Sequence, residues 1–273
     1  MAEWMLEDEF GDVIGKARRG NGLSVEELAE ASDVEAAVVA AFEGYRRDPS
    51  ESESGALAEA LGLRAAQLWE LAQEGWLPQR PDPDLGDGTV VESLYFAPDR
   101  VWAYLLGDGE SCVAIDCGAP LEDMLTAIGD RQLLGIVLTH ADADHIYSLE
   151  GLLARGAVPV YVHSSEVDRV SAPQVIGFDD GDLIELGRYR FSVLHAPGHT
   201  SGCCGLHVPG AVFSGDTIFA GSVGGTRMGA SYYRGHLGAV RAKILSLPGE
   251  TKLFHGHGAH SSVADELAHN CFF

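Results

Sequence analysis

Four residues that can bind a metal ion lie within one short stretch of this 273-residue chain, and they restrict its fold more than any other feature. His140, Asp142, Asp144 and His145 directly follow the apolar run 136–138, which we expect to be a buried strand. Imidazole and carboxylate groups gathered on one loop are typical of a metal site. The fold must therefore bring this loop to a rim where further ligands can meet it.

Three later residues repeat the arrangement. His199, Asp216 and His257 each follow an apolar strand and lie among glycines, which let the backbone turn sharply and bring side chains to one rim. A single histidine in such a place is usually a structural residue. The complete set instead predicts a site for one or two transition-metal ions.

These residues form the signature of the metallo-β-lactamase superfamily, which residues 94–273 resemble. The similarity is greatest to the small glyoxalase-II-like hydrolases, through residues 214–222 and the ending that contains His257, Gly258, Glu266 and residues 270–272. The resemblance implies an α+β fold, the αββα sandwich, with the metal site at one edge.

The resemblance also implies a role for each ligand. The first metal would be faced by His140, Asp142 and His199, the second by Asp144, His145 and His257, and Asp216 would bridge the two. Asp144 would act in catalysis as well, as a ligand that also orients the attacking water.

Asp142 departs from the superfamily pattern, which usually has His at this position. A carboxylate is a harder ligand than imidazole and adds a negative charge, so iron or manganese become alternatives to zinc, the metal that we expect first. Asp142 could also coordinate loosely. His140, His199 and Asp216 alone would then resemble the mononuclear iron site of persulfide dioxygenases, which gives a second candidate activity.

The expected chemistry is hydrolysis by a metal-bound hydroxide, because paired cations lower the pKa of bound water and polarise a carbonyl oxygen. We expect a small ester, thioester or lactone as the substrate. A glutathione thioester is not expected, because the chain ends soon after His257 and lacks the C-terminal helical domain with which glyoxalase II enzymes bind glutathione.

Several residues near the expected mouth are weaker candidates. Tyr147 replaces a small glycine of the relatives and could narrow the pocket or simply pack. Arg227, Tyr232 and Tyr233 precede a helix expected to begin near Gly235, and they could meet an anionic group of the substrate or lie in a solvated loop. His255 and His260 are expected to support the ligands or lie on the surface.

The remaining periodicity predicts two β layers that are covered by helices. We expect strands at 101–106, 112–115, 135–138, 158–162, 183–186, 189–194, 205–208, 212–213 and 252–254, and helices at 121–128, 149–154, 236–245 and 263–269.

The first 77 residues have a different texture, with short helices rich in Ala, Leu and Glu. Ser24 and Glu27 form a capping box, and helices are expected at 34–43, 57–61 and 65–71. Residues 8–72 resemble the Cro/C1-type helix-turn-helix family. Residues 78–93, which contain Pro and Gly, are expected to be a linker, so the predicted regions are 1–77, 78–93 and 94–273.

The helix that would read DNA argues against DNA binding. Its stretch 35–41 offers no donor to a base edge, and residues 1–77 carry seventeen acidic against six basic residues. We therefore expect self-association as a homodimer, or docking of a partner, in preference to DNA. A regulator whose metal domain senses a ligand or metal is the third candidate function.

Charge and composition limit the remaining possibilities. A net charge of −23 disfavours anionic membranes and nucleic acid, and no apolar run is long enough to span a membrane. The N-terminus has no secretory pattern, and the five cysteines show no paired motif. We expect a cytoplasmic protein with reduced cysteines that acts on a small molecule.

Overall fold

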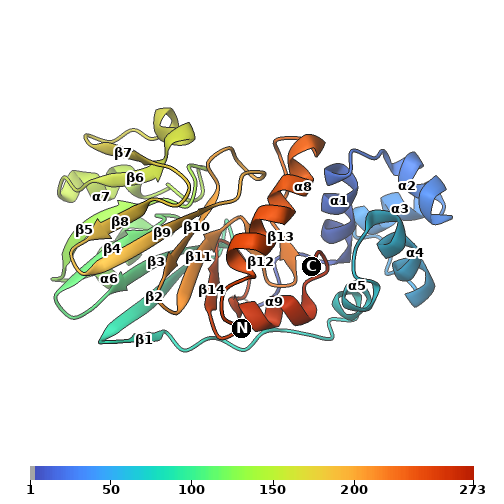
Figure 1. Ribbon diagram of the computed structural model, residues 1–273, viewed down its shortest axis with the longest axis horizontal. Coiled ribbons are helices and arrows are strands. Elements are labelled where there is room, and N and C mark those ends of the chain that lie inside the picture. Colours follow the sequence, from blue (N-terminus) through green and yellow to red (C-terminus); the bar gives the residue numbers. More distant parts are fainter. Residues whose placement is uncertain (1–3) are drawn as a thin grey trace.

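The computed structural model describes residues 4–273 (Figure 1). A helical region, residues 10–72, lies at one end of the elongated molecule, and two packed sheets with their helices form the other end. No helix of the described residues is long and apolar enough to cross a membrane.

The helical region contains α1 (Phe10–Gly20), α2 (Val25–Ser32), α3 (Ala36–Glu43), α4 (Glu51–Leu61) and α5 (Ala65–Ala72). The expected capping box of Ser24 and Glu27 begins α2. One expected helix start was wrong, and one helix was missed. α4 begins well before residue 57, because Ser50 and Glu53 form a second capping box. α1 was not predicted, because its cap is Glu9 and no Ser or Thr marks its start.

The first sheet has seven strands in sequence order, antiparallel from β1 to β4 and parallel from β4 to β7. These strands are β1 (Asp84–Gly86), β2 (Thr89–Phe96), β3 (Val101–Gly107), β4 (Ser111–Ile115), β5 (Gln132–Val137), β6 (Val160–His163) and β7 (Val175–Phe178).

The second sheet has the order β15-β14-β11-β10-β9-β8, and only its β11–β14 pair is parallel. Its strands are β8 (Leu183–Leu186), β9 (Tyr189–His195), β10 (Cys204–Val208), β11 (Ala211–Gly215), β14 (Lys252–His255) and β15 (Ser261–Ser262). A small hairpin, β12 (Ile218–Phe219) and β13 (Ser222–Val223), follows β11.

Helices cover both outer faces, which confirms the αββα sandwich. α6 (Leu121–Ile128) and α7 (Leu149–Arg155) pack on the first sheet. α8 (Ala230–Ala239), its π-helical extension η2 (Val240–Ile244) and α9 (Val263–His269) pack on the second. The core between the sheets is aromatic, with Tyr104, Phe191, Phe213 and Phe254 fully or almost fully buried.

Two element boundaries correct the sequence analysis. Residues 84–93, expected to be linker, form β1 and most of β2, because the prolines end at Pro83 and the chain beyond it can pair at a sheet edge. α8 begins at Ala230, well before Gly235. Tyr233 is therefore helical and buried, and it packs against Gly20 of α1.

The helical region shares its core with the sandwich. Val13, Ile14 and Ala17 of α1 belong to one buried apolar cluster with Tyr233 and Val240. The backbone N–H of Arg64 donates to the carbonyl of Cys271 (2.8 Å), and its guanidinium donates to the carbonyl of Leu267 (2.9 Å). The two regions are therefore packed together along α1, α8 and the C-terminal segment.

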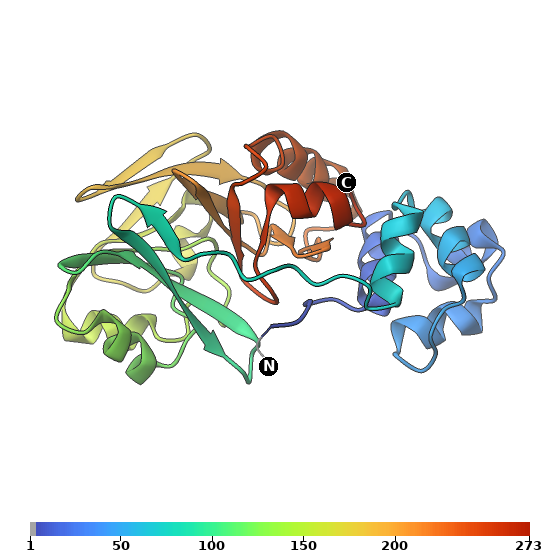
Figure 2. The ribbon, with the colours of Figure 1, turned by 90° about the horizontal axis from the view of Figure 1, so that it is seen from below.

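Two extended segments also run between the regions (Figure 2). We call residues 4–9 the N-terminal strap; the other segment follows α5. The backbone N–H of Ala259 donates to Met5 in the strap (2.7 Å), and the indole of Trp4 donates to the carbonyl of Pro78 (2.8 Å). The strap therefore lies along the sandwich before the chain enters α1.

All five cysteines are buried and free in the described part of the chain, as the sequence predicts. Burial raises the pKa of the Cys203 and Cys204 thiols well above its usual value, so this adjacent pair is not a reactive site.

Candidate metal centre

The predicted ligands lie on four loops, each of which follows a strand. The loop after β5 carries His140, Asp142, Asp144 and His145, and the loops after β9, β11 and β14 carry His199, Asp216 and His257 respectively. These segments are far apart in the sequence, and the fold brings them to one edge of the sandwich.

Six of the seven residues form two groups whose ligand atoms lie within 4.8 Å of one another. The first group is His140, His199 and Asp216; the second is Asp144, His145 and His257. This arrangement is typical of the dinuclear sites of metal-dependent hydrolases.

Asp216 faces both groups. Its Oδ2 lies 3.2 Å from Nε2 of His199, and its Oδ1 lies 3.3 Å from Nε2 of His145 and 3.5 Å from Nε2 of His257. One carboxylate oxygen is therefore directed to each group, which is the geometry that a bridging ligand requires.

Each imidazole is oriented through its other ring nitrogen. Nδ1 of His145 is 2.9 Å from Asp116, while Nδ1 of His199 and of His257 each lie 3.0 Å from a backbone carbonyl, those of Gly225 and Arg100. Nδ1 of His140 lies 3.0 Å from the hydroxyl of Thr139. These contacts leave all four Nε2 atoms facing the centre, as in metal-ligating histidines.

The donor atoms at the centre fit metal ions. Nε2 of His140, Nε2 of His145 and Oδ1 of Asp216 are fully buried and have no hydrogen-bond partner among the described residues. Buried polar atoms without partners are costly, so a cluster of them indicates a ligand that satisfies all of them together. Divalent cations match this set of imidazole and carboxylate donors.

The carboxylates and imidazoles of the centre shift one another's pKa values toward the charged forms. Burial alone would raise the pKa of Asp216, but His257, His199 and His145 hold it well below the usual value. Burial lowers the pKa of His145, yet Asp216 and Asp116 outweigh it and raise that pKa well above normal. The cavity thus favours ionised carboxylates, the form that binds metal.

Glycine is required where the backbone touches the centre. A Cβ on Gly256 would lie 2.3 Å from Oδ1 of Asp216, and one on Gly224 would lie 1.8 Å from its carbonyl oxygen. The glycines near Asp216 and His257 therefore allow the close approach that the ligands need.

The comparisons with known proteins identify the family. Residues 97–257 match the model of the metallo-beta-lactamase superfamily. The chain belongs to this superfamily. No helix-turn-helix family model matches the helical region. That region is confirmed as all-helical, and its helix-turn-helix character stays a prediction.

Relatives of this metallo-β-lactamase-superfamily protein include two curated enzymes. A probable metallo-hydrolase from Bacillus subtilis is 29% identical over 64% of this chain and 93% of its own length. A hydroxyacylglutathione hydrolase from Haemophilus influenzae is 27% identical over 60% of this chain and 88% of its own length. With the two His/Asp groups, these likenesses make the protein a metallo-hydrolase of the superfamily.

A solved structure shares the fold of the sandwich. TTHA1623 in a di-iron-bound form is 30% identical and superposes with a TM-score of 0.58, covering 67% of this chain and 100% of that one.

Asp142 lies beside the first group and is not part of it. Its Oδ2 is 3.3 Å from Nε2 of His199 and 3.5 Å from Nε2 of His140, while Arg169 donates to Oδ1 (2.8 Å) and Arg227 donates to Oδ2. Burial alone would raise the pKa of Asp142, but these partners hold it far below normal. Two arginines thus meet at the carboxylate that replaces the superfamily's histidine.

The weaker candidates have mixed positions. Tyr147 is 60% exposed and stacks on Phe96, with ring centroids 5.5 Å apart, and Tyr232 is 43% exposed on α8. Neither is among the residues shown to contact a metal ligand. Tyr233 is buried between α8 and α1, so our expectation that it lies in a loop near the substrate was wrong.

His255 and His260, the two histidines that flank His257 in the sequence, are buried, so the expectation that they could lie on the surface was wrong for both. His255 lies between Ser214 (2.8 Å) and Ser261 (2.9 Å), with no ligand in contact. His260 packs among aromatic rings, with its centroid 4.7 Å from that of Trp102.

Sequence reasoning missed three supporting residues. Asp116 accepts from the N–H and hydroxyl of Thr139 and contacts His145. Glu166 accepts from the backbone N–H groups of Ala141 (2.6 Å) and Gly202 (3.0 Å), and thus fixes the two loops that carry His140 and His199. Arg169 donates a hydrogen bond to the carboxylate of Asp142. Of these three residues, only Asp116 could have been found from the sequence. It directly follows the buried strand β4, just as the metal ligands follow buried strands.

Proposed function

We propose that the protein hydrolyses a small ester, thioester or lactone that carries an anionic group close to the scissile carbonyl. The observation behind the anionic group is the meeting of Arg169 and Arg227 at Asp142, beside the first ligand group. The relative named as a hydroxyacylglutathione hydrolase supports a thioester as one member of this class.

His140, His199 and Asp216 would hold one metal ion, and Asp144, His145 and His257 a second, with Asp216 shared. Divalent ions supply two things when bound: a water of lowered pKa and polarisation of the carbonyl oxygen. Zinc remains our first expectation, with iron or manganese as alternatives, because the donors are imidazoles and carboxylates without thiolate.

Asp144 is the candidate for handling the proton of the attacking water. Its side chain is 34% exposed, the most accessible of the six grouped donors, and its Oδ2 lies 3.4 Å from Nε2 of His257. Burial acts to raise the pKa of Asp144, but His257 and His145 keep it below normal. An ionised carboxylate held in this way can orient a water and accept its proton.

Arg169 and Arg227 supply recognition. Their side chains are 45% and 55% exposed, so part of each guanidinium remains open to solvent while another part binds Asp142. A guanidinium has five N–H donors, so one bonded to Asp142 can still bind a carboxylate or phosphate of the substrate. Arg227 is thus proposed to bind substrate, while Tyr147 and Tyr232 remain candidates at the rim.

Metal analysis and paired substrates test the proposal. We expect protein loaded with zinc to contain close to two ions per chain. It should hydrolyse an acyl thioester with a free carboxylate at least about 10-fold more efficiently than the methyl ester of the same compound. The reason is that one charge-assisted hydrogen bond to that carboxylate is worth about 1.5–3 kcal/mol. Arg227→Met should raise KM for the charged substrate only. Equal KM changes for both substrates would remove the proposed role of Arg227.

The second candidate activity rests on the three-donor first group. Two histidines and one carboxylate match the facial triad of nonheme iron enzymes, and Asp142 stands outside that group. One iron per chain in protein purified without added metal, together with oxygen consumption on a persulfide, would favour the dioxygenase. Two ions and hydrolysis without oxygen uptake would exclude it.

The helical region is proposed to serve self-association or a protein partner, and a role as a sensing regulator depends on such a partner. The exposed residues of the stretch 35–41 are Glu35, which caps α3, and Ala37, and neither provides a hydrogen-bond donor side chain for a base edge.

A further inference from the structure

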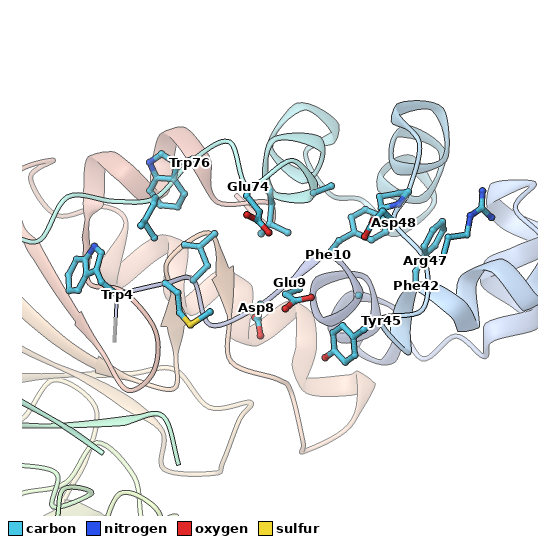
Figure 3. Close-up of a pocket in the computed structure, with 17 residues that line it drawn as sticks. Trp4, Asp8, Glu9, Phe10, Phe42, Tyr45, Arg47, Asp48, Glu74 and Trp76 are labelled. Atoms are coloured by element: carbon cyan, nitrogen blue, oxygen red, sulfur yellow. The ribbon is translucent and has the colours of Figure 1, made fainter. Parts of the chain in front are cut away.

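A cavity lies where the N-terminal strap, the α3–α4 connection and the segment after α5 meet (Figure 3). Its volume is about 380 Å³, and it shares no lining residue with the two ligand groups. We call it the strap cavity. Its size is in the range of cavities that hold small organic molecules.

The inner wall of the strap cavity is apolar. Phe10 and Phe42 are buried there with their rings packed edge to face at 5.4 Å, and the guanidinium of Arg47 lies over the Phe42 ring, 5.4 Å from its centroid. Leu71 and Ala72 continue the wall from α5. Trp4 and Trp76 lie at the opposite end from Tyr45 in the close-up (Figure 3). An occupant therefore needs an apolar body.

The rim of the strap cavity is acidic. Asp8, Glu9, Asp48 and Glu74 line it, against the single basic residue Arg47. Asp8 is paired with Lys16, and Arg47 is paired with Glu53, which lies outside the cavity lining (2.7 Å).

The other three carboxylates have no such partner. Among residues 4–273, Glu9, Asp48 and Glu74 take part in no salt bridge. Glu9 accepts from the backbone N–H of Asp12 at the start of α1, so Asp48 and Glu74 are the lining carboxylates that leave negative charge next to the apolar wall. That combination favours an apolar cation over a neutral or anionic molecule.

The backbone at the rim is also unusual. Tyr45 (φ 53°) and Glu74 (φ 51°) both adopt the left-handed conformation, which residues other than glycine rarely adopt. The hydroxyl of Tyr45 donates to Asp12, which fixes the ring at the rim. Such conformations persist where surrounding contacts hold them, so both ends of the rim have defined positions.

We propose that the strap cavity is a binding site for a small organic cation with an aromatic or branched apolar body. The apolar part packs on Phe10 and Leu71, and the ammonium or guanidinium group meets Asp48 and Glu74. The site is separate from the hydrolytic centre, and nothing in the proposed hydrolysis requires it.

Calorimetry on the metal-loaded full chain tests the proposal with three probes of one shape. We expect 4-bromophenethylammonium to bind at least about 10-fold more tightly than 2-(4-bromophenyl)ethanol, and 4-bromophenylacetate to show no detectable binding. A crystal with the cationic probe should place the anomalous bromine signal against Leu71.

Matched double variants distinguish binding of the cation in the strap cavity from a general electrostatic attraction of cations to this acidic protein. Asp48→Asn with Glu74→Gln should weaken binding of the cation at least about 10-fold, whereas Glu30→Gln with Glu59→Gln, which removes equal charge from exposed helix positions, should leave it unchanged. All four sites are exposed, and thermal unfolding checks that both variants stay folded.

Three results with the probes and variants would each overturn the proposal, and a fourth concerns the oligomeric state. The three are equal affinity for the cationic and neutral probes, equal weakening in both double variants, and bromine density at the metal centre in place of the strap cavity. A dimer in solution that covers Trp4 and Trp76, together with absent probe binding, would also overturn it and would show the cavity to be an interface between copies.

Discussion

The metal centre and the helical region differ in whether their polar side chains are buried. At the centre, His140, His145 and Asp216 are buried with ligand atoms that no described residue satisfies. In the helical region the buried positions are mainly apolar, and the acidic side chains lie at the surface. Burial of an unpaired polar atom is costly, so its repeated occurrence marks function, whereas apolar burial marks packing.

The regions nevertheless form one packed unit. Lys16 of α1 pairs with Asp8, donates to the carbonyl of Val223 (2.9 Å) and lies over the ring of Phe219, 4.8 Å from its centroid. That ring packs edge to face against the ligand His257. The helical region therefore supports one wall of the hydrolytic site, although none of its residues is a ligand.

The largest expected effect concerns the centre itself. Asp216→Asn removes the charge that both groups share, so metal affinity should fall at least about 100-fold and hydrolysis should fall with it. Metal content by mass spectrometry and activity against the thioester measure both. Asp130→Asn, an exposed control, should change neither. Unchanged metal content in Asp216→Asn would contradict the bridging role.

The next effect tests whether the two regions unfold together. Tyr233→Ala opens a cavity between α8 and α1 and should lower the free energy of unfolding by about 3 kcal/mol. Denaturant unfolding gives the value, and hydrogen exchange should show both regions losing protection together. Tyr232→Ala, a neighbour that is 43% exposed, should cost below about 1 kcal/mol. Loss of protection in α1–α5 alone would show separate units.

A buried acid near the contact between the regions predicts a dependence of stability on pH. Burial raises the pKa of Glu266 to about 7, from an ordinary 4.5. The folded state then binds more protons than the unfolded state between these values, so the free energy of unfolding falls as pH rises from about 4.5 to 7, by about 3 kcal/mol.

Glu266→Gln should remove that slope, because the amide imitates the protonated acid. Gly221 and Asn270 both donate to the Glu266 carboxyl and can donate to the amide oxygen as well. The variant should be more stable than the parent above pH 7, as urea unfolding across pH 4–8 would show. The exposed control Glu250→Gln should keep the parental slope. An identical slope in Glu266→Gln would refute the assignment.

The smallest expected effect is on DNA. The helical region should shift no duplex in a gel at low salt, because α3 lacks donors and the region is acidic. A mixed operator library gives a broad test, and a basic helix-turn-helix protein serves as the positive control. A sequence-specific shift would show that residues outside α3 read the bases.

Local signals explain what could be predicted. The ligand run at 140–145, the alternation of the strands and the capping box at Ser24 depend on residues that are neighbours in sequence. α6 was predicted at its observed bounds for the same reason. By contrast, β1 and most of β2 were assigned to a linker, because edge pairing depends on a partner strand that local composition does not reveal.

The sequence by itself determined the superfamily fold and the residues that can bind metal, because spacing after buried strands sets which side chains reach the edge. The tertiary structure alone decided that Arg169 and Arg227 meet at Asp142, that Asp116 orients His145, and that the strap cavity exists. Those features join residues from separate segments, and contacts of that kind follow from packing of the whole chain, since no local pattern encodes them.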